Sequence, residues 1–470
     1  MKLTIRNVIE IVILSIIIIF AFAIKTTEPL FIILLLIWTF CMLYAARDIR
    51  NRAMLFAFLI SFFIFLLGRD VVKQFLNYET EIFDKNAQNH AWMSFSVSLI
   101  TLIFFYNLFE KRVTTENHNK LTATSEIYRL SVRQNSLLFY YISFLFAIIS
   151  KIAISIYVSN SSFTDYYTGY SDYLRENTIL YIMSKLEIMM PISWAVYLGT
   201  FPSKKEVRFP LFLYLVYMVV SLGTGQRSTA MLGLLFLTVY FLFRDRGFET
   251  WVTKKMVVLA IVSLPFLALF ISFYELSRQG SSTGSLSLVN GIVKFFYDQG
   301  VTSTIVKRAY TFKSFIPKQI YTLEFAHSGI LARLFDIPVY HGNNVEHALY
   351  GGSFTHSLSY IIMRPSYLAG RGTGSCYIAE LYQDFSYPGI ILGNAIYGYI
   401  IYKISDLREN NYISNGYKLF IIPFILWAPR GSFTHFISQT LSPITIATFI
   451  LIYTLSLAMA FKYIRNLDKV

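Results

Sequence analysis

The chain has few cysteines, few charged side chains and no spacing typical of a metal site. Only two of its 470 residues are cysteine. Cys41 falls in an apolar run and Cys376 in a long polar connection, so geometry excludes a disulfide between them. Charged residues make up 14%, against about 25% in a soluble domain. The histidines lack zinc-protease spacing, and the net charge of +14 is not gathered in a basic run with interleaved aromatics. A soluble globule, such a metal centre and a nucleic-acid partner are therefore not expected.

Long apolar stretches dominate the sequence instead. Hydrophobic residues make up 55% and aromatic residues 17%, with a mean hydropathy of +0.52. Twelve apolar runs fall at 8–24, 30–46, 53–68, 91–109, 137–158, 179–200, 210–222, 229–243, 256–273, 388–403, 418–428 and 443–460. A bilayer core takes about 20 helical residues, so the runs beginning at 210, 229 and 418 are short, as in broken or re-entrant segments. The sequence predicts an all-α polytopic integral membrane protein with about 12 transmembrane helices.

The distribution of Lys and Arg predicts the orientation of these spans. With a cytoplasmic N-terminus, 23 Lys and Arg fall in the inner segments and 7 in the short outer segments. This positive-inside bias places both termini in the cytoplasm. The first apolar run has no small-residue cleavage site and is expected to remain as a span. We expect about nine spans in residues 1–273, a large extracytoplasmic loop at 274–387 and about three spans in 388–470.

The predicted outer loop is too long to be a simple connector. It carries four of the seven histidines, and loops of this length usually have a function. Its apolar patches at 292–296 and 330–335 are too short to span a bilayer and are expected to form short amphipathic helices. The pentapeptide Gly-Ser-Phe-Thr-His occurs at 352–356 and again at 431–435, which we interpret as coincidence.

Three turns rich in Gly, Ser or Thr each contain an arginine and precede a segment that can begin a helix. They lie at 223–229, 370–375 and 430–432, all on the predicted outer side. Glycines let backbone N–H groups converge, a helix N-terminus carries positive partial charge, and a guanidinium adds a fork matched to phosphate oxygens. For any single turn, a loop with a headgroup-anchoring arginine is the alternative. The candidate anion-binding residues are Arg227, Ser228, Arg364, Arg371, Gly372, Gly374 and Arg430.

The turn at 370–375 leads into a predicted helix that carries two carboxylates. Apolar residues recur there at helical spacing, while Glu380 and Asp384 lie four apart on another face. Paired carboxylates suit glycosyl transfer, in which a general base accepts the proton of the attacking hydroxyl. A solvated acidic face is the alternative. His356 and His435 each lie near an anion turn and are further candidates for the base, or else ordinary polar contacts.

These motifs resemble a known family. The string Gly-Thr-Gly-Ser-Cys-Tyr-Ile-Ala-Glu-Leu-Tyr-Gln-Asp-Phe at 372–385, the Thr-Gly-Gln-Arg-Ser at 224–228 and the twelve-span plan with a large late outer loop resemble the Wzy proteins. These are the bacterial O-antigen and capsular polysaccharide repeat-unit polymerases. The sequence departs from the family pattern at Cys376, where Ser is more usual, and at 386–388, where Ser-Tyr-Pro replaces a turn with glycine.

The resemblance implies a metal-independent membrane glycosyltransferase without a cofactor. Such an enzyme transfers a growing glycan from an undecaprenyl pyrophosphate carrier to the next lipid-linked oligosaccharide repeat unit, on the outer face of the bacterial cytoplasmic (inner) membrane. Arg227, Arg371 and Arg430 would then stabilise the leaving pyrophosphate, with Arg364 close by. The implied partners are the lipid-linked oligosaccharide, membrane lipids and a chain-length-regulating co-polymerase, and no nucleic acid.

Two other functions remain open. A ligase of the same superfamily would use the same donor with a different acceptor. A polysaccharide or lipid-oligosaccharide transporter (flippase) would be expected to carry inverted repeats and several ionisable residues near the bilayer midplane. The predicted spans offer few, notably Lys151, Lys185 and Glu187, and we expect Lys185 and Glu187 to pair near a helix end. A scaffold would have no need of clustered anion turns.

Overall fold

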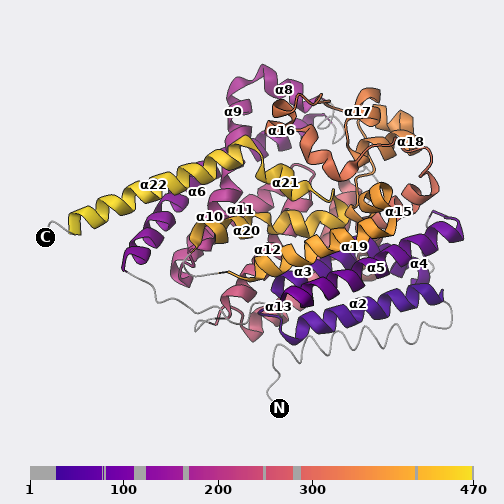
Figure 1. The fold of residues 1–470 in the computed structure, drawn as a ribbon, viewed down its shortest axis with the longest axis horizontal. Helices are drawn as coiled ribbons and strands as arrows, with labels where there is room; N and C mark the ends of the chain where they lie inside the picture. Colours follow the sequence, from indigo (N-terminus) through magenta and orange to yellow (C-terminus); the bar gives the residue numbers. More distant parts are fainter. Residues whose placement is uncertain are drawn as a thin grey trace, which may run out of the picture.

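The computed structural model describes residues 28–76, 78, 81–110, 123–161, 169–246, 250–278, 287–407 and 411–467. Every regular element within these ranges is a helix, which confirms the all-α prediction for this part of the chain. The predicted first span at 8–24 lies outside the described residues. Figure 1 shows the helices packed into one bundle, with many of them running in nearly the same direction or its reverse.

Seven helical stretches are long and apolar enough to cross a membrane. They are Pro29–Arg47, Ala53–Leu76, Lys85–Glu110, Ser125–Asn160, Thr178–Gly199, Lys254–Phe273 and Pro443–Asn466. The chain is therefore an integral membrane protein, with seven candidate spans found among the described residues where the sequence predicted about 12.

The helices that make up these stretches carry the following labels. They are α2 (Pro29–Arg47), α3 (Ala53–Phe62), η2 (Phe63–Leu67), α4 (Gly68–Leu76), α5 (Lys85–Glu110), α6 (Ala123–Asn160), α9 (Thr178–Leu186), α10 (Met189–Gly199), α13 (Lys254–Arg278) and α22 (Pro443–Leu467). The short helix α8 (Tyr170–Glu176) precedes α9. η2 is a π-helical segment that joins α3 to α4 without interruption.

The three short apolar runs form continuous helices rather than broken segments. They are α11 (Lys204–Leu222), α12 (Ser228–Arg244) and α20 (Tyr412–Trp427). α11 and α20 begin several residues before their apolar runs, because the mixed polar and apolar stretches at 204–209 and 412–417 are helical as well. The prediction of broken segments was therefore wrong at these three places, although α12 and α20, with 17 and 16 residues, remain shorter than the roughly 20 residues that a bilayer core takes.

Glycines allow two central helices to approach closely. A Cβ atom on Gly199, at the end of α10, would lie 2.6 Å from the backbone nitrogen of Gly416 in α20. A Cβ on Gly416 would in turn lie 2.6 Å from the Cα of Val196. Small residues at such crossings are typical of helix packing in membranes. α10 and α20, far apart in the sequence, are fixed against each other and against α6 in this way.

One end of the bundle, called the far end below, collects segments that the sequence placed on the same side. Arg246, just after α12, donates to the carbonyl of Arg50 before α3 at 2.7 Å and to that of Ser405 at the end of α19 (Tyr377–Ser405) at 2.8 Å. Arg52 binds Glu110 at the end of α5. Cations at the C-terminal ends of helices also offset the negative end of the helix dipole.

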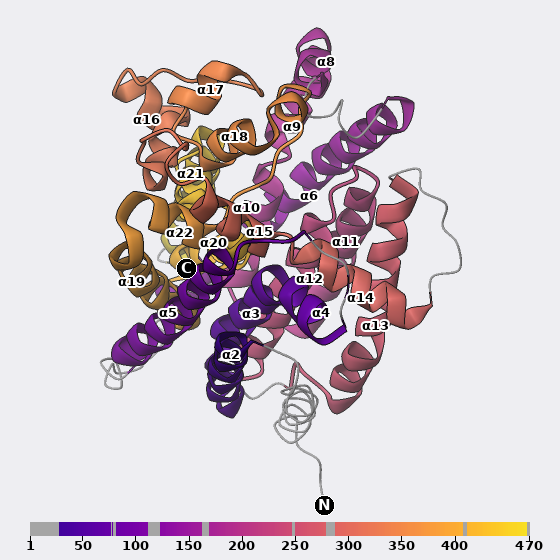
Figure 2. The same cartoon turned by 90° about the vertical axis from the view of Figure 1, so that its right-hand side faces the viewer.

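The long segment after α13 folds into short helices at the opposite end, called the site end. They are α14 (Leu288–Gln299), α15 (Thr302–Thr311), η3 (Tyr321–His327), α16 (Gly329–Leu334), α17 (Val345–Tyr350) and α18 (Phe354–Leu368). The apolar patches at 292–296 and 330–335 fall in α14 and α16. Figures 1 and 2 both show α16–α18 above α5 and α19.

Two contacts position this segment. Lys307 of α15 forms a buried ion pair with Asp70 of α4, and Trp92 of α5 donates to the other oxygen of that carboxylate at 2.9 Å. At its C-terminal side the segment runs directly into α19 (Tyr377–Ser405). This helix crosses the boundary predicted at 387/388 and is interrupted only at Ser386, whose φ of 55° lies in the left-handed region.

An ion pair within the spans differs from the predicted one. Glu187 lies at the break between α9 and α10 and contacts Lys151 of α6, with 2.5 Å between Nζ and Oε1. Lys185 instead places its Nζ 5.1 Å from the centre of the Tyr181 ring. The break turns Glu187 away from its neighbour in sequence and toward α6, so the expected Lys185–Glu187 pair was wrong.

Candidate functional site

Glu380 lies in the first turn of α19 and is completely buried, with an exposed fraction of 0%. The helix begins after Cys376, and the residue before it folds back onto the carboxyl group: Ser375 Oγ lies 2.5 Å from Glu380 Oε1. Oε2 accepts a hydrogen bond from the backbone N–H of Phe433 at 2.7 Å. Both oxygens therefore have a protein partner, which holds the group in one orientation.

Asp384, one helical turn later, caps the start of η3. Its Oδ1 accepts from the backbone N–H of Tyr321 at 3.1 Å. Its Oδ2 accepts from the N–H and the hydroxyl of Thr322 at 2.8 and 2.9 Å. The first N–H groups of a helix have no partner within the helix, so a carboxylate there satisfies them and favours the dipole. The spacing of Glu380 and Asp384 thus brings both onto the side of α19 that η3 covers.

Glu324 of η3 is a third carboxyl group at this place, and the sequence analysis did not identify it. The hydroxyl groups of Ser353 and Ser432 act to lower its pKa, and its charge acts on Glu380. Unlike Glu380, its side chain is partly exposed. Glu324, Glu380 and Asp384 are called the carboxylate site below.

Burial raises the pKa of all three carboxyl groups, which lie outside the spanning helices. The pKa of Glu380 is raised well above its ordinary value by burial and by the negative charge of Glu324. Burial raises the pKa of Glu324 against the opposing effect of the two serine hydroxyl groups. It also raises the pKa of Asp384 against the hydrogen bonds from Thr322. Among the described residues, no salt bridge joins a cation to these groups.

Three consecutive residues join the parts of the carboxylate site. Ser432 acts to lower the pKa of Glu324, Phe433 donates its N–H to Glu380, and the Thr434 hydroxyl donates to the carbonyl of Thr322 at 3.2 Å. Ser432 is the second residue of the pentapeptide at 431–435, and Ser353 is the second residue of the copy at 352–356. The equivalent serines of the two copies therefore both act on the pKa of one carboxyl group. The repeat, which we interpreted as coincidence, was the sequence signal that could have located Glu324.

Arg430 stands directly before this stretch. It ends η4 (Ala428–Arg430), and its Nη1 donates to the backbone carbonyl and to the Oε1 of Gln299, each at 3.2 Å. Its guanidinium carbon lies 5.6 Å from the ring centres of Phe65 and Trp427. The turn precedes α21 (His435–Thr440), as predicted, although Arg430 itself lies at the end of a helical turn.

Arg227 occupies the helix start that the sequence predicted. It is the residue immediately before α12, whose first residue is Ser228, and both are partly buried. The preceding turn needs a glycine at Gly225, where φ is 82°. A Cβ on Gly223 would lie 2.6 Å from the hydroxyl of Ser155 in α6, so the turn also packs tightly on that helix.

Arg364 and Arg371 are exposed on the surface of the long segment. The Arg364 guanidinium lies 4.9 Å from the centre of the Tyr360 ring. The backbone carbonyl of Arg371 accepts a hydrogen bond from Asn343 at 2.9 Å. Arg227 precedes α12 and Arg430 ends η4, so the structure distributes the candidate anion-binding arginines over several elements.

The glycine-rich turn after Arg371 has one strict requirement. Gly374 has a φ of 78°, which a residue with a side chain rarely adopts, whereas Gly372 is exposed and a Cβ there would meet only ordinary contacts. The turn is held to α18 by the N–H of Thr373, which donates to Ser359 Oγ at 2.9 Å. This attachment fixes the approach of the chain to Ser375 and Glu380.

The two candidate histidines end the two copies of the pentapeptide. His356 Nδ1 lies 2.9 Å from the hydroxyl of Tyr367, and its ring stacks on His347 at 3.6 Å between centres. Burial, together with His347, lowers the pKa of His356 to about 4. His435 begins α21 with its ring centre 5.5 Å from that of Phe424, and burial lowers its pKa. Both imidazoles are therefore neutral at neutral pH.

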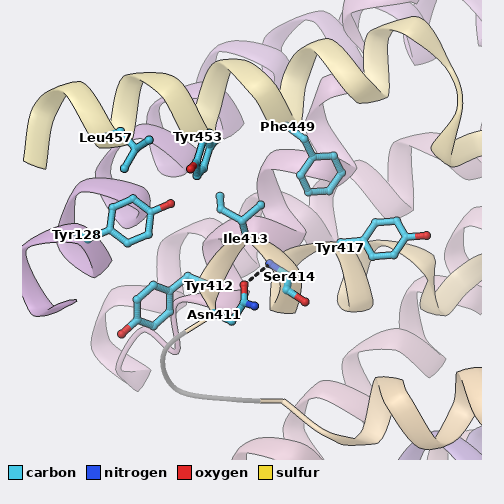
Figure 3. A pocket seen from close by; sticks show the side chains of 9 residues that line it. All are labelled: Tyr128, Asn411, Tyr412, Ile413, Ser414, Tyr417, Phe449, Tyr453 and Leu457. Atoms are coloured by element: carbon cyan, nitrogen blue, oxygen red, sulfur yellow. Dashed lines mark hydrogen bonds between the residues drawn. The ribbon is translucent and has the colours of Figure 1, made fainter. Parts of the chain in front are cut away.

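A cavity of about 780 Å³ lies elsewhere, between α6, α20 and α22. Figure 3 shows the side chains that line it, among them Tyr128, Tyr417, Phe449 and Tyr453, with Asn411 accepting a hydrogen bond from the N–H of Ser414 at the start of α20. It borders the early part of α6 and of α20, away from the carboxylate site, and it contains no carboxylate or cation.

Comparison with known families identifies the class of protein. A model of the family described as O-antigen polysaccharide polymerase Wzy matches residues 5–462, nearly the whole chain. No curated protein and no solved structure gives a significant match. The resemblance of the motifs at 224–228 and 372–385 is thereby confirmed. The chain belongs to the Wzy family of O-antigen polysaccharide polymerases, membrane proteins that act on lipid-linked oligosaccharide repeat units.

Proposed function

We propose that this Wzy protein transfers a growing glycan from an undecaprenyl pyrophosphate carrier to the next lipid-linked repeat unit. Family membership supports O-antigen polymerase activity in general. The observation that supports a place for the reaction is the carboxylate site, where three carboxyl groups have raised pKa values and the chain that follows Arg430 binds Glu380. Clusters of perturbed titratable groups are typical of active sites.

The chemistry requires a proton acceptor and a site for a leaving phosphate. As the acceptor hydroxyl attacks the anomeric carbon, its proton must leave, and a carboxylate with a raised pKa accepts it efficiently near neutral pH. We assign this task to the carboxylate site with Glu380 and Asp384, and treat His356 and His435 as the alternative acceptors. Neither histidine carries a positive charge at neutral pH, so each can accept a proton.

The leaving carrier takes the bonding electrons as its pyrophosphate. Arg430 is the nearest candidate along the chain to Phe433 and Thr434, which contact Glu380 and η3, and we assign it to this pyrophosphate. Arg227 with Ser228, and Arg371 with Gly372, Gly374 and Arg364, are proposed to hold further phosphate oxygens of the two lipid-linked substrates. The energy comes from cleavage of the glycosyl–phosphate bond, without a cofactor.

The orientation follows from this assignment. We propose that the site end faces outward from the bacterial cytoplasmic membrane and that both termini are cytoplasmic. An engineered Ser328→Cys at the site end should react with an impermeant thiol reagent in intact cells, and Lys205→Cys only after lysis. The native Cys41 and Cys376 are buried and unpaired and should contribute little background. The reverse labelling order would overturn the orientation.

The function is tested by reconstitution. Purified protein in lipid vesicles, supplied with a lipid-linked repeat unit, is expected to produce carrier-linked glycans of two and more units together with free undecaprenyl pyrophosphate. Transfer only to an acceptor that is not a lipid-linked repeat unit would indicate the ligase. Movement of the lipid-linked unit between leaflets without any joining would indicate the transporter.

A further inference from the structure

We propose that Tyr310, in the last turn of α15, and Lys313, just after that helix, bind one sugar ring of the lipid-linked oligosaccharide. The side chains of His90, Tyr382 and Tyr387 support these two and are positioning residues. The five residues are called the ring stack below. The inference rests on the proposed polymerase function and adds to it a place where the glycan is held away from the bond that forms.

His90 is the buried centre of the ring stack. It lies in the second turn of α5, and its exposed fraction is 6%. Its ring lies against that of Tyr310, with 4.4 Å between the ring centres and 19° between the planes. Its Nδ1 lies 3.1 Å from the hydroxyl of Tyr387, and its Nε2 lies 3.4 Å from that of Ser94. Both ring nitrogens therefore have a partner, which holds the imidazole and the tyrosine stacked on it in one orientation.

Tyr382 of α19 connects the histidine to the cation. Its ring centre lies 4.1 Å from that of His90 and 5.3 Å from that of Tyr387, which meets it at 74°. The Nζ of Lys313 lies 4.5 Å from the centre of the Tyr382 ring. None of the salt bridges among the described residues includes Lys313. The ammonium group is thus held beside the rings without an acid that neutralises it.

Tyr310 is the member of the ring stack that is open to a ligand. Its exposed fraction is 36%, although His90 covers one face of the ring, so the exposed surface belongs to the opposite face and the edge. The C–H groups on one face of a sugar ring pack well on the negative face of an aromatic ring. Tyrosine offers this contact area at a small cost in side-chain entropy. The ammonium group of Lys313, three residues later, can donate to the oxygens of the same sugar.

A tyrosine at the membrane–water interface is the alternative role for such a residue. The composition of the ring stack favours a sugar. It combines stacked aromatic rings with a cation and with a buried histidine that forms hydrogen bonds, and aromatic side chains with a few fixed polar groups are typical of small-molecule sites. An anchor in the headgroup region requires none of these supporting contacts.

The position of the ring stack relative to the carboxylate site also favours a sugar. Tyr382 lies two residues after Glu380 and two before Asp384. With about 3.6 residues per turn, its side chain leaves α19 on nearly the opposite side from these two acids. α15 and η3 both pack on α19 (Figure 1). The ring stack therefore lies across one helix from the carboxylate site, roughly 10 Å away, which an oligosaccharide can span.

This distance predicts which kinetic constant the subsite affects. A sugar that is remote from the reacting bond is bound equally in the ground state and in the transition state. Such uniform binding lowers KM and leaves kcat unchanged. Loss of the subsite should therefore raise the KM for the lipid-linked repeat unit without slowing the chemical step.

The first test measures binding without catalysis. The probe is the repeat-unit oligosaccharide of the host, released from its lipid carrier by mild acid and titrated calorimetrically into purified protein. Tyr310→Ala should raise the Kd roughly two- to tenfold, whereas Tyr310→Phe keeps the ring and should bind like wild type. Lys313→Gln should raise the Kd by a similar factor. The matched control is Tyr350→Ala, at an exposed tyrosine of α17 in the same segment, which should leave the Kd unchanged.

The second test uses the reconstituted polymerisation assay. Tyr310→Ala should raise KM by the same factor as Kd, with kcat within about twofold of wild type. His90→Ala removes the ring that supports Tyr310 and should raise KM as well. His90→Phe keeps a stacked ring and should restore most of the affinity. Thermal unfolding of each variant separates these changes from a loss of folded protein.

The contrary outcomes are distinct. Wild-type Kd in Tyr310→Ala or in Lys313→Gln would overturn the subsite. If Tyr310→Ala lowered only the thermal stability or the amount of protein in the membrane, Tyr310 would be an interfacial anchor and the inference would be wrong. A fall in kcat at unchanged KM would also contradict it, because it would place Tyr310 at the reacting bond. Failure of the proposed function has another signature: wild-type protein would bind the oligosaccharide but make no glycan longer than one unit.

Discussion

The two ends of the helix bundle handle charge in different ways. At the far end, acids and bases neutralise each other directly: Arg52 lies 2.9 Å from Glu110, and Arg133 lies 2.7 Å from Glu206. At the site end, three carboxyl groups share one neighbourhood with no described cation bound to them, while Arg364 and Arg371 are exposed. At the far end, ion pairs between acids and bases attach the ends of the helices to one another. Ion pairs such as Arg308–Glu81 do form elsewhere at the site end, but the carboxylate site keeps its acids apart from cations and leaves them available to a substrate.

This separation has a cost that the far end avoids. A buried carboxyl group without a cation is stabilised only by hydrogen bonds and by keeping its proton. Glu380 has both, through Ser375, Phe433 and its raised pKa. Buried carboxyl groups without a cation are expected mainly at active sites, where a raised pKa is needed for catalysis. The comparison therefore predicts that variants at paired charges change stability, whereas variants at separated charges change activity.

The largest effect is expected at the one place where the site end does pair buried charges. The Lys307 Nζ and Asp70 Oδ1 atoms are 2.5 Å apart, with only 4% and 3% of the two side chains exposed. Lys307→Met leaves an uncompensated buried aspartate and should destabilise the protein by about 3–5 kcal/mol. Unfolding in detergent, followed by Trp fluorescence, measures this, because Trp92 donates to the same carboxylate.

The control for this experiment is an exposed pair. Arg175 and Asp172 lie 3.2 Å apart with 71% and 68% of their side chains exposed, so Arg175→Ala should cost less than about 1 kcal/mol. If Lys307→Met were no more destabilising than Arg175→Ala, the buried pair would not be what attaches α15 to the bundle. A double variant that replaces Asp70 and Lys307 with apolar residues should recover part of the loss.

The next effect concerns the arginines kept apart from the acids. If Arg227, Arg371 and Arg430 bind pyrophosphate through paired N–H donors, lysine keeps the charge but loses the fork. Each Arg→Lys variant should lose about 3 kcal/mol of transition-state stabilisation, roughly a hundredfold in rate. Single repeat units on the carrier should accumulate while expression stays normal.

Arg333 provides the comparison for these variants. It is exposed in α16, outside the three anion turns, and Arg333→Lys should change glycan length little. Headgroup anchoring predicts that lysine substitutes freely at all positions. Wild-type glycan length in all three Arg→Lys variants would show that the pyrophosphate assignment is wrong, and would favour the transporter.

Part of this architecture could be predicted from the sequence, for identifiable reasons. Apolar runs and the spacing of Glu380 and Asp384 are local signals. Helical periodicity therefore predicted the helices correctly and placed both carboxyl groups on one side of α19. Glu324 could not be found in that way. It lies in a short 3₁₀ segment with no periodic pattern, and Ser353 and Ser432, which act on its pKa, come from distant parts of the chain. The repeated pentapeptide pointed to the surroundings of Glu324, but no feature of the sequence near either copy indicated that the two copies lie close together in space.

The errors have physical causes as well. The pairing of Lys185 with Glu187 assumed one continuous helix, but the break between α9 and α10 directs Glu187 to Lys151. The short runs were predicted to be broken because hydropathy ignores the polar first turns of α11 and α20. Arg227, Arg371 and Arg430 share a type of turn, yet each turn is attached to a different helix, and only tertiary contacts determine where it lies.

The smallest expected effect is that of a chelator, for which we predict none. Among the described residues, no group of three or more His, Cys, Asp and Glu side chains is arranged to hold a metal ion. The carboxylate site is the most acidic place available, but its oxygens already accept hydrogen bonds from Ser375, Thr322 and Phe433 N–H, which a cation would have to displace. EDTA should therefore leave the rate of polymerisation by purified protein unchanged. A loss of activity that a divalent ion restores would show that the separated acids bind a metal, and the comparison between the two ends would then have to include that cation as the missing partner.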